Sequence, residues 1–162
     1  MNSQRQGYRG SEIAPANNSL GANADMSHCM AELYSIALSL PPVEPETTGA
    51  DGAPFQTDEW NKLHRLLKEK IGPLDTYWEI FDSTAKEEPV QGSLAGDISD
   101  IYFDLKRILE LEESDVPKSD LQFDWRFDFR SHWARHLLGA LTAIHHRHIK
   151  CLQHADDVRN VQ

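Results

Sequence analysis

The chain has 162 residues and contains 26 Asp and Glu against 16 Lys and Arg, which gives a formal net charge of -10 at pH 7. This length fits one domain with a tail. The mean hydropathy of -0.56 argues against a membrane protein. The acidic balance argues against a general affinity for nucleic acid, which requires a basic face. Two cysteines are too few for a disulfide framework, so we expect a cytoplasmic protein.

The N-terminal part of the chain divides into a tail, a helix and a linker. Residues 1–25 are rich in Asn, Ser, Gly, Gln and Ala, which predicts a disordered tail. A single helical domain is expected over residues 26–154. It opens with a helix over 26–40, which Pro41 and Pro42 end. Residues 41–56 contain four prolines and predict an extended linker within the domain. The sequence leaves open whether Met1 or Met26 is the true start.

A second helix is predicted from Thr57 to about Ile71, because acids occupy its first turn and Gly72-Pro73 ends it. His64 lies on its apolar face and is interpreted as a core histidine. Residues 74–81 carry several aromatic side chains and predict a short fifth element or lid over the bundle. A polar loop over residues 82–92 follows.

The most regular pattern covers residues 93–112, where Ser93 is a plausible N-cap for a third long helix. Its apolar arc consists of Leu94, Ile98, Ile101, Leu105, Ile108 and Leu109. An acidic stripe, formed by Asp97, Asp100 and Asp104, runs along one edge of that arc at spacings of three and four residues. This arrangement places three carboxylates beside the expected core.

The last segment, from residue 120 to 154, begins ambiguously. Phe123, Trp125, Phe127 and Phe129 alternate with polar residues, as in a half-buried strand, yet they also pair at a spacing of four residues. The helical pattern continues to Ile144, and no second convincing strand is available for pairing. We therefore predict an all-α bundle of four main helices, with a frayed end over residues 155–162.

Charged groups on this last helix suggest a partner for the acidic stripe. With a constant turn of about 100° per residue, Arg126 falls near the centre of the apolar arc, with Arg130 beyond it. A guanidinium in a core requires a partner. Our leading hypothesis is a structural polar network comprising Asp97, Asp100, Asp104, Arg126, Arg130, His132 and His136.

A metal site is the alternative. Asp128, His132 and His136 follow one another at intervals of four residues and therefore stack on one helical face. With carboxylates from the acidic stripe they could bind a divalent metal, for which the candidate ligands are Asp100, Asp104, His132 and His136. No other cofactor is expected. No phosphate-binding loop, nucleophile elbow, C-x-x-C or EF-hand loop is found, so an enzyme is not favoured.

Several of these residues resemble a small bacterial domain family of unknown function. The resemblance rests on YWEIFD at 77–82, SLAGDISDIYFDLK at 93–106, WRF at 125–127 and HWARH at 132–136. The chain departs from the family pattern at Ile98, Phe103 and Ala134. The resemblance implies a helical cytoplasmic domain without an established activity, and it covers the acids and histidines of the predicted network. Phe103, where the family often has a basic residue, puts any role requiring that base in doubt.

These observations favour a protein-interaction or regulatory module over an enzyme. The argument combines many aromatic residues with an acidic surface, which suits a basic patch on an unknown protein partner. The metal-binding bundle, or a metal-dependent enzyme, remains the alternative. Neither the partner nor the oligomeric state can be obtained from the sequence.

Overall fold

The computed structural model describes residues 16–46, 57–82 and 84–160, and within these ranges it leaves out the side chains of residues 16–23, 151 and 154–160. The elements follow in the order α1 (Ala16–Ser39), α2 (Thr57–Ile71), a 3-10 turn (Gly72–Leu74), β1 (Thr76–Glu79), β2 (Val90–Ser93), α3 (Leu94–Glu112), α4 (Lys118–Asp128), a π-helical turn (Phe129–Trp133) and α5 (Ala134–Asn160).

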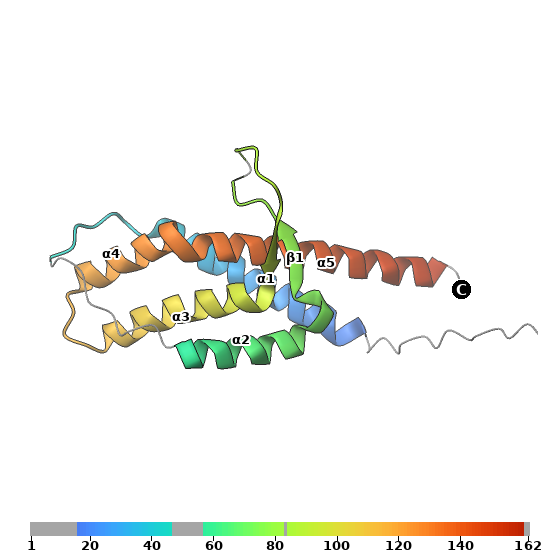
Figure 1. Cartoon of the computed structure of the whole chain (residues 1–162), viewed down its shortest axis with the longest axis horizontal. Helices are drawn as coiled ribbons and strands as arrows, with labels where there is room; N and C mark the ends of the chain where they lie inside the picture. Colours follow the sequence, from blue (N-terminus) through green and yellow to red (C-terminus); the bar gives the residue numbers. More distant parts are fainter. Residues whose placement is uncertain (1–15, 47–56, 83, 161–162) are drawn as a thin grey trace, which may run out of the picture.

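The helices pack in a simple order. α2 lies on α3, α3 lies on α5, and α5 lies on α1 (Figure 1). The chain runs without a break from α4 through the π-helical turn into α5, so that these three elements form one long rod. Counted in this way, the described residues form four main helices, and the predicted all-α class is confirmed. None of the helices in the described ranges combines the length and the apolar character needed to cross a bilayer.

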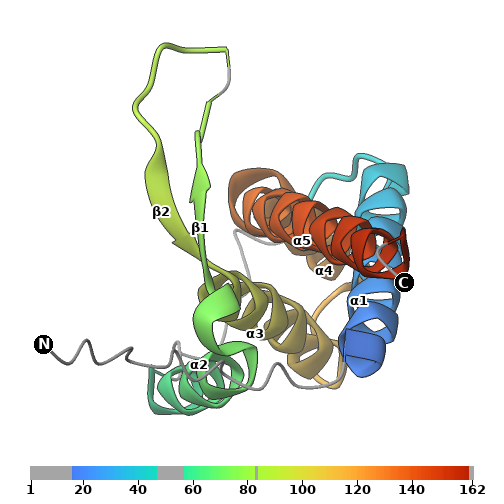
Figure 2. The same ribbon diagram turned by 90° about the vertical axis from the view of Figure 1, so that its right-hand side faces the viewer.

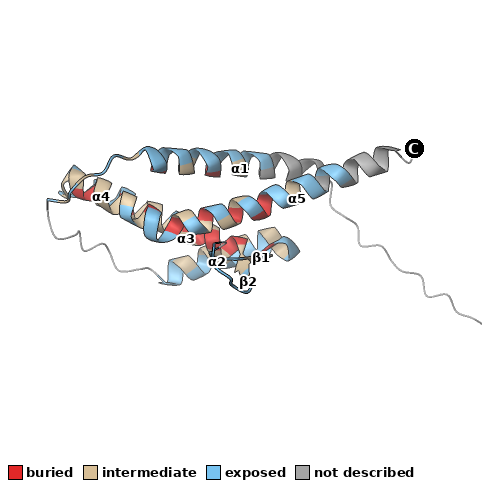
Figure 3. Cartoon of the chain, turned by 90° about the horizontal axis from the view of Figure 1, so that it is seen from above, coloured by how far each residue is buried: buried red, intermediate tan, exposed pale blue. Residues whose placement is uncertain are grey.

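The core lies where α1, α3 and the long rod face one another. Figure 3 shows the buried residues concentrated along α3 and α5. Trp133 and Leu137 are almost fully buried and are the largest apolar side chains to be so. The buried apolar cluster comprises Met30, Ala37, Leu94, Ile101, Phe129, Trp133, Leu137, Ala140, Ala143 and Ile144.

Both terminal helices are longer than expected. α1 begins at Ala16, so residues 16–25 are helical although they were predicted to belong to a disordered tail; residues 1–15 lie outside the described residues. Once residues 26–39 are helical, extending the helix backwards forms one hydrogen bond for each residue that is fixed, and alanines favour this extension. α5 likewise continues to Asn160, beyond the predicted frayed end at 155.

The aromatic segment at 74–81 forms no fifth helix. It begins with the last residue of the 3-10 turn and contains β1, which pairs antiparallel with β2 from the segment predicted as a loop. Thr76 lies opposite Ser93 and Tyr77 lies opposite Gly92. Figure 2 shows the hairpin projecting away from the helices. The sequence analysis missed it because β2 is only four residues long and the pairing is not local.

The π-helical turn changes the phase of the long rod. Such a turn contains about one residue more than an α-helical turn, so residues before it are rotated by about 100° relative to a wheel of constant period. Phe129 and Trp133, at its two ends, are both buried, with ring centroids 4.8 Å apart. The predicted positions of Arg126 and Asp128 relative to His136 assumed an unbroken α-helix and do not hold.

Candidate functional site

The first turn of α3 is fastened to the base of the hairpin. The Ser93 hydroxyl accepts a hydrogen bond from the Gly96 backbone N–H at 3.1 Å, so Ser93 is the N-cap of α3, as predicted. The buried Asp75 carboxylate accepts bonds from the Ser93 hydroxyl at 3.0 Å and from the Ala95 N–H at 2.8 Å. A carboxylate at this place also complements the helix dipole. Asp75, just before β1, and Ser93, at the end of β2, therefore both accept hydrogen bonds from the first turn of α3.

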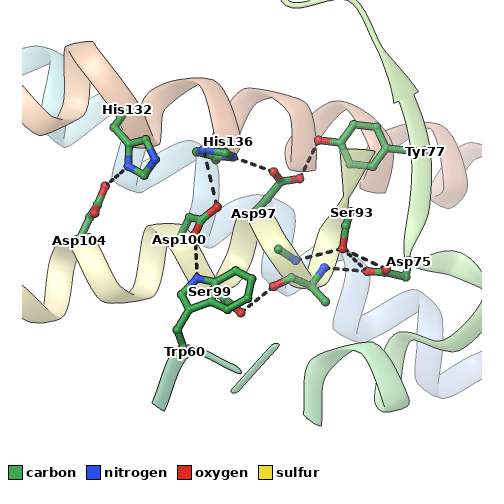
Figure 4. A network of polar contacts seen from close by, with 12 residues as sticks. Trp60, Asp75, Tyr77, Ser93, Asp97, Ser99, Asp100, Asp104, His132 and His136 are labelled. Atoms are coloured by element: carbon green, nitrogen blue, oxygen red, sulfur yellow. Dashed lines mark hydrogen bonds and ion pairs between the residues drawn. The ribbon is translucent and has the colours of Figure 1, made fainter. Parts of the chain in front are cut away.

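Asp97 is the centre of the polar network shown in Figure 4. It is buried in the first turn of α3. Its Oδ2 accepts a hydrogen bond from the Tyr77 hydroxyl at 2.6 Å, and its Oδ1 lies 2.8 Å from Nδ1 of His136. One carboxylate therefore joins β1, α3 and α5.

Asp100 extends the network to α2. Its Oδ2 lies 3.7 Å from Nε2 of His136, and its Oδ1 accepts a hydrogen bond from Nε1 of Trp60 at 2.7 Å. Trp60 in turn stacks on His64 with ring centroids 4.8 Å apart, so His64 is a half-buried stacking partner. The contacts Tyr77, Asp97, His136, Asp100 and Trp60 thus run across the bundle from the hairpin to α2.

Asp104 and His132 form a second pair one turn further along, and the His132 ring lies edge-on to the His136 ring with centroids 4.8 Å apart. Oδ2 of Asp104 lies 2.6 Å from Nδ1 of His132. This pair is nearer to solvent than the pair of Asp97 and His136. Burial nevertheless raises the pKa of Asp104, while His132 acts against that rise.

The surroundings of Asp97 shift several pKa values. The hydrogen bond to Asp97 raises the pKa of His136 above its ordinary value, and the charges of Asp100 and Asp97 add to the rise. Burial and then Asp97 raise the pKa of Tyr77 far above its usual range, so its hydroxyl remains a donor. Burial, followed by the charge of Asp97, raises the pKa of Glu79. The site therefore favours the protonated form of His136.

Two glycines make room for the Tyr77 ring. A Cβ added at Gly92 would lie 2.6 Å from the ring, and one added at Gly139 would lie 2.5 Å from the Tyr77 hydroxyl oxygen and 2.8 Å from a carboxylate oxygen of Glu79. All three distances are shorter than real Cβ contacts allow. Tyr77 therefore lies in a slot between β2 and α5, and β1 crosses α5 at Gly139.

Of the seven predicted network residues, the structure brings together the three aspartates and the two histidines. Arg126 and Arg130 form no ion pair within the described residues. The arginine that meets carboxylates of the rod is Arg107 on α3, which contacts Asp128 and lies 3.8 Å from Asp124. The π-helical turn explains this difference, because it rotates α4 relative to α5.

The metal candidates do not converge. The described residues contain no set of three or more His, Cys, Asp or Glu side chains arranged to hold a metal ion. His132 and His136 each turn Nδ1 to a different aspartate, and Asp128 contacts Arg107 instead of joining them. The hypothesis of a metal centre at Asp100, Asp104, His132 and His136 therefore has no ligand set in the part of the chain that the structure describes.

A groove lies outside the network, between the hairpin and α5. Its volume is about 1030 Å³, at the upper end of the sizes typical of ligand pockets. The β1 side contributes Trp78, Ile80 and Phe81, all of which are exposed, and α5 contributes Leu138. The guanidinium of Arg135 lies over the Phe81 ring, 4.5 Å from its centroid. The groove thus combines exposed aromatic groups with a charged helical face.

Sequence reasoning missed Tyr77, Trp60 and Arg107 as members of these contacts. Gly139 carried a signal for the first of them, because a glycine within a helix costs about 1 kcal/mol relative to alanine and is retained where another group approaches closely. Trp60 and Arg107 left no comparable signal, because long side chains on amphipathic helices have many alternative partners.

Comparisons with known proteins identify the fold and leave the activity open. The family model described as "Domain of unknown function (DUF5063)" matches residues 20–150, which confirms the predicted membership in a family of unknown function. The crystal structure of protein BF1032 from Bacteroides fragilis is similar, with a TM-score of 0.64 and 17% identity over 80% of each chain. This likeness concerns the fold alone. The comparison with curated proteins found no match.

Proposed function

The chain belongs to the DUF5063 family, so its activity has to be inferred from its own geometry, and we propose that it is a protein-interaction module that binds through the groove between the hairpin and α5. The observation that carries this proposal is the group of exposed apolar side chains on the projecting hairpin. Trp78 is 69% exposed, and Ile80 and Phe81 are about half exposed. Large apolar side chains gathered in one place on a surface are typical of binding sites.

The anchoring of the hairpin supports this role. A two-stranded hairpin has little stability on its own in water. Here the partly buried hydrogen bond from Tyr77 to Asp97, together with the bonds of Ser93 and Asp75, holds β1 and β2 against the helices. A surface that is already ordered loses less conformational entropy on binding. We therefore assign the polar network a positioning role for the groove. The low cysteine count leads us to place this module in the cytoplasm.

A display library of protein fragments, selected on the full chain, tests the proposal. Trp78→Ser removes the most exposed aromatic residue of the hairpin. Leu109→Ser makes the same kind of change on α3, where Leu109 is 57% exposed and outside the groove. We expect selected fragments to bind the native chain and Leu109→Ser equally well, and Trp78→Ser at least about tenfold more weakly.

Circular dichroism and thermal melts of both variants establish that they remain folded. If selected fragments bind Trp78→Ser and the native chain with equal affinity, the groove is not the binding surface and the proposal is wrong. A selection that enriches no fragment at all contradicts it as well.

A further inference from the structure

We propose that the segment bound in the groove is acidic and carries an apolar side chain between its acids; this inference rests on the proposed function. The groove is lined by the cations Arg135, Arg147 and Lys150 and by His146, against the single carboxylate of Glu79. This local excess of positive charge occurs in a chain whose net charge is -10. The overall acidity had suggested a basic partner, and the groove has the opposite sign.

The cations at the two ends of the groove are available for a ligand. Neither Arg135 nor Lys150 forms an ion pair within the described ranges, although the chain has 26 acids. Arg135 is held in place over the Phe81 ring, 4.5 Å from its centroid. Arg147 already donates a hydrogen bond to the carbonyl oxygen of Thr76 at 3.0 Å, so it belongs partly to the hairpin anchor. Arg135 and Lys150 therefore bracket the groove, and the charge of Arg135 also lowers the pKa of Glu79 within it, against the larger effect of burial.

The α5 side chains between the charged ends are apolar or small, and the Tyr77 hydroxyl and the Glu79 carboxylate lie against Gly139 among them. Leu138, Gly139, Thr142 and Ala143 line the same side of α5 between Arg135 and His146. At a rise of about 1.5 Å per residue, the distance along α5 from residue 135 to residue 150 is about 22 Å. An extended peptide covers this length with about seven residues. The groove thus fits an acid at each end of a short segment with an apolar residue between them.

Nucleic acid fits this groove less well, although aromatic and basic groups also bind single strands. A nucleic acid carries a charge at every residue and gains affinity by releasing several counterions. The groove offers only three permanent cations, contains the carboxylate of Glu79, and belongs to a strongly acidic chain. A segment with a few well-placed acids meets the cations without extended repulsion.

The test compares two double variants with the same change in net charge. Arg135→Glu/Lys150→Glu reverses both ends of the groove, while Arg65→Glu/Lys68→Glu reverses two exposed cations on α2. Both are titrated with groove-dependent peptides from the fragment selection, and with the same peptides after every Asp and Glu has been replaced by Asn and Gln. Fluorescence anisotropy measures the affinity at about 0.05 and 0.5 M NaCl.

We expect the selected peptides to be enriched in Asp and Glu around an apolar residue. Their affinity should fall at least about tenfold on amide replacement or groove reversal, change little for the α2 variant, and weaken at high salt. If the groove-dependent peptides contain no acids, or if replacing their acids leaves the affinity unchanged, this inference is wrong. Neither result would contradict the proposed interaction module. Binding of an oligothymidine in place of acidic peptides would overturn this inference too. Peptides that bind Trp78→Ser as tightly as the native chain would contradict both proposals.

Discussion

Two Asp–His pairs join α3 to the long rod, and they differ in burial, in interatomic distance and in their additional partners. Oδ1 of Asp97 and Nδ1 of His136 are 2.8 Å apart, with side chains 7% and 16% exposed. Asp104 and His132 approach more closely, at 2.6 Å, yet their side chains are 22% and 46% exposed. The shorter contact is the one that solvent screens. Burial and additional partners, and not the interatomic distance, decide which pair holds the fold together.

Of the changes that test this difference between the two pairs, Asp97→Ala is expected to have the largest effect on stability. This change leaves the Tyr77 hydroxyl and the His136 ring without their acceptor at a buried place, and we expect the free energy of unfolding to fall by about 3 kcal/mol. Urea unfolding followed by circular dichroism measures the loss. A loss below about 1 kcal/mol would show that the buried network contributes no more than a surface pair.

Gly139→Ala addresses the slot in which Tyr77 lies. An added methyl group would lie 2.5 Å from the Tyr77 hydroxyl oxygen, so we expect a net loss of about 1–2 kcal/mol despite the better helix propensity of alanine. Gly96→Ala is the matched control, because its Cβ would meet Ser93 atoms at an ordinary 3.5 Å and should stabilise α3 slightly. Combining Gly139→Ala with Tyr77→Phe should recover part of the loss, and strict additivity of the two changes would contradict the slot.

The pH dependence of stability tests whether the protonated His136 ring stabilises the fold. Because the folded state raises the pKa of this ring, mainly through Asp97 and also through Asp100, its protonation stabilises the fold below the ordinary value of 6.5. That contribution is lost as the pH rises through the higher folded-state pKa, while Arg135 opposes it. Urea unfolding between about pH 6 and 8 should therefore show a falling stability that is less steep in His136→Asn. Equal slopes would contradict the assignment.

The smallest effect is expected for Asp104→Ala. Its partner His132 is nearly half exposed, and solvent-exposed ion pairs contribute at most about 1 kcal/mol. We expect a change within that limit in the same urea experiment. A loss as large as that of Asp97→Ala would mean that the two pairs are equivalent and that burial does not explain their difference.

The parts of the site that could be predicted from the sequence lie on the regular helix α3. A constant helical period places Asp97, Asp100 and Asp104 on one edge of its apolar arc, and the Ser93 cap follows from the residue type and the start of that arc. His132 lies near the end of the π-helical turn and His136 in the first turn of α5, and their rings are adjacent, with centroids 4.8 Å apart. The helical period therefore predicted which side chains share a face wherever the helix is a regular α-helix.

The remaining parts depended on non-local or irregular structure. Arg126 was expected in the core because no simple pattern announces a π-helical turn, and Arg107 took the contacts with the carboxylates of α4. Tyr77 reaches Asp97 only because β1 pairs with β2, which depends on tertiary packing more than on propensity. The sequence analysis therefore found the acids and histidines of the network and missed the hairpin that they anchor.

Ser93 is at once the last residue of β2 and the N-cap of α3, so no hinge separates the hairpin from the helix. A displacement of the projecting loop is therefore transmitted to the backbone amides in the first turn of α3. The Gly96 N–H, whose acceptor is the Ser93 hydroxyl, becomes a reporter of what happens at the tip: its hydrogen–deuterium exchange should slow when the groove is occupied.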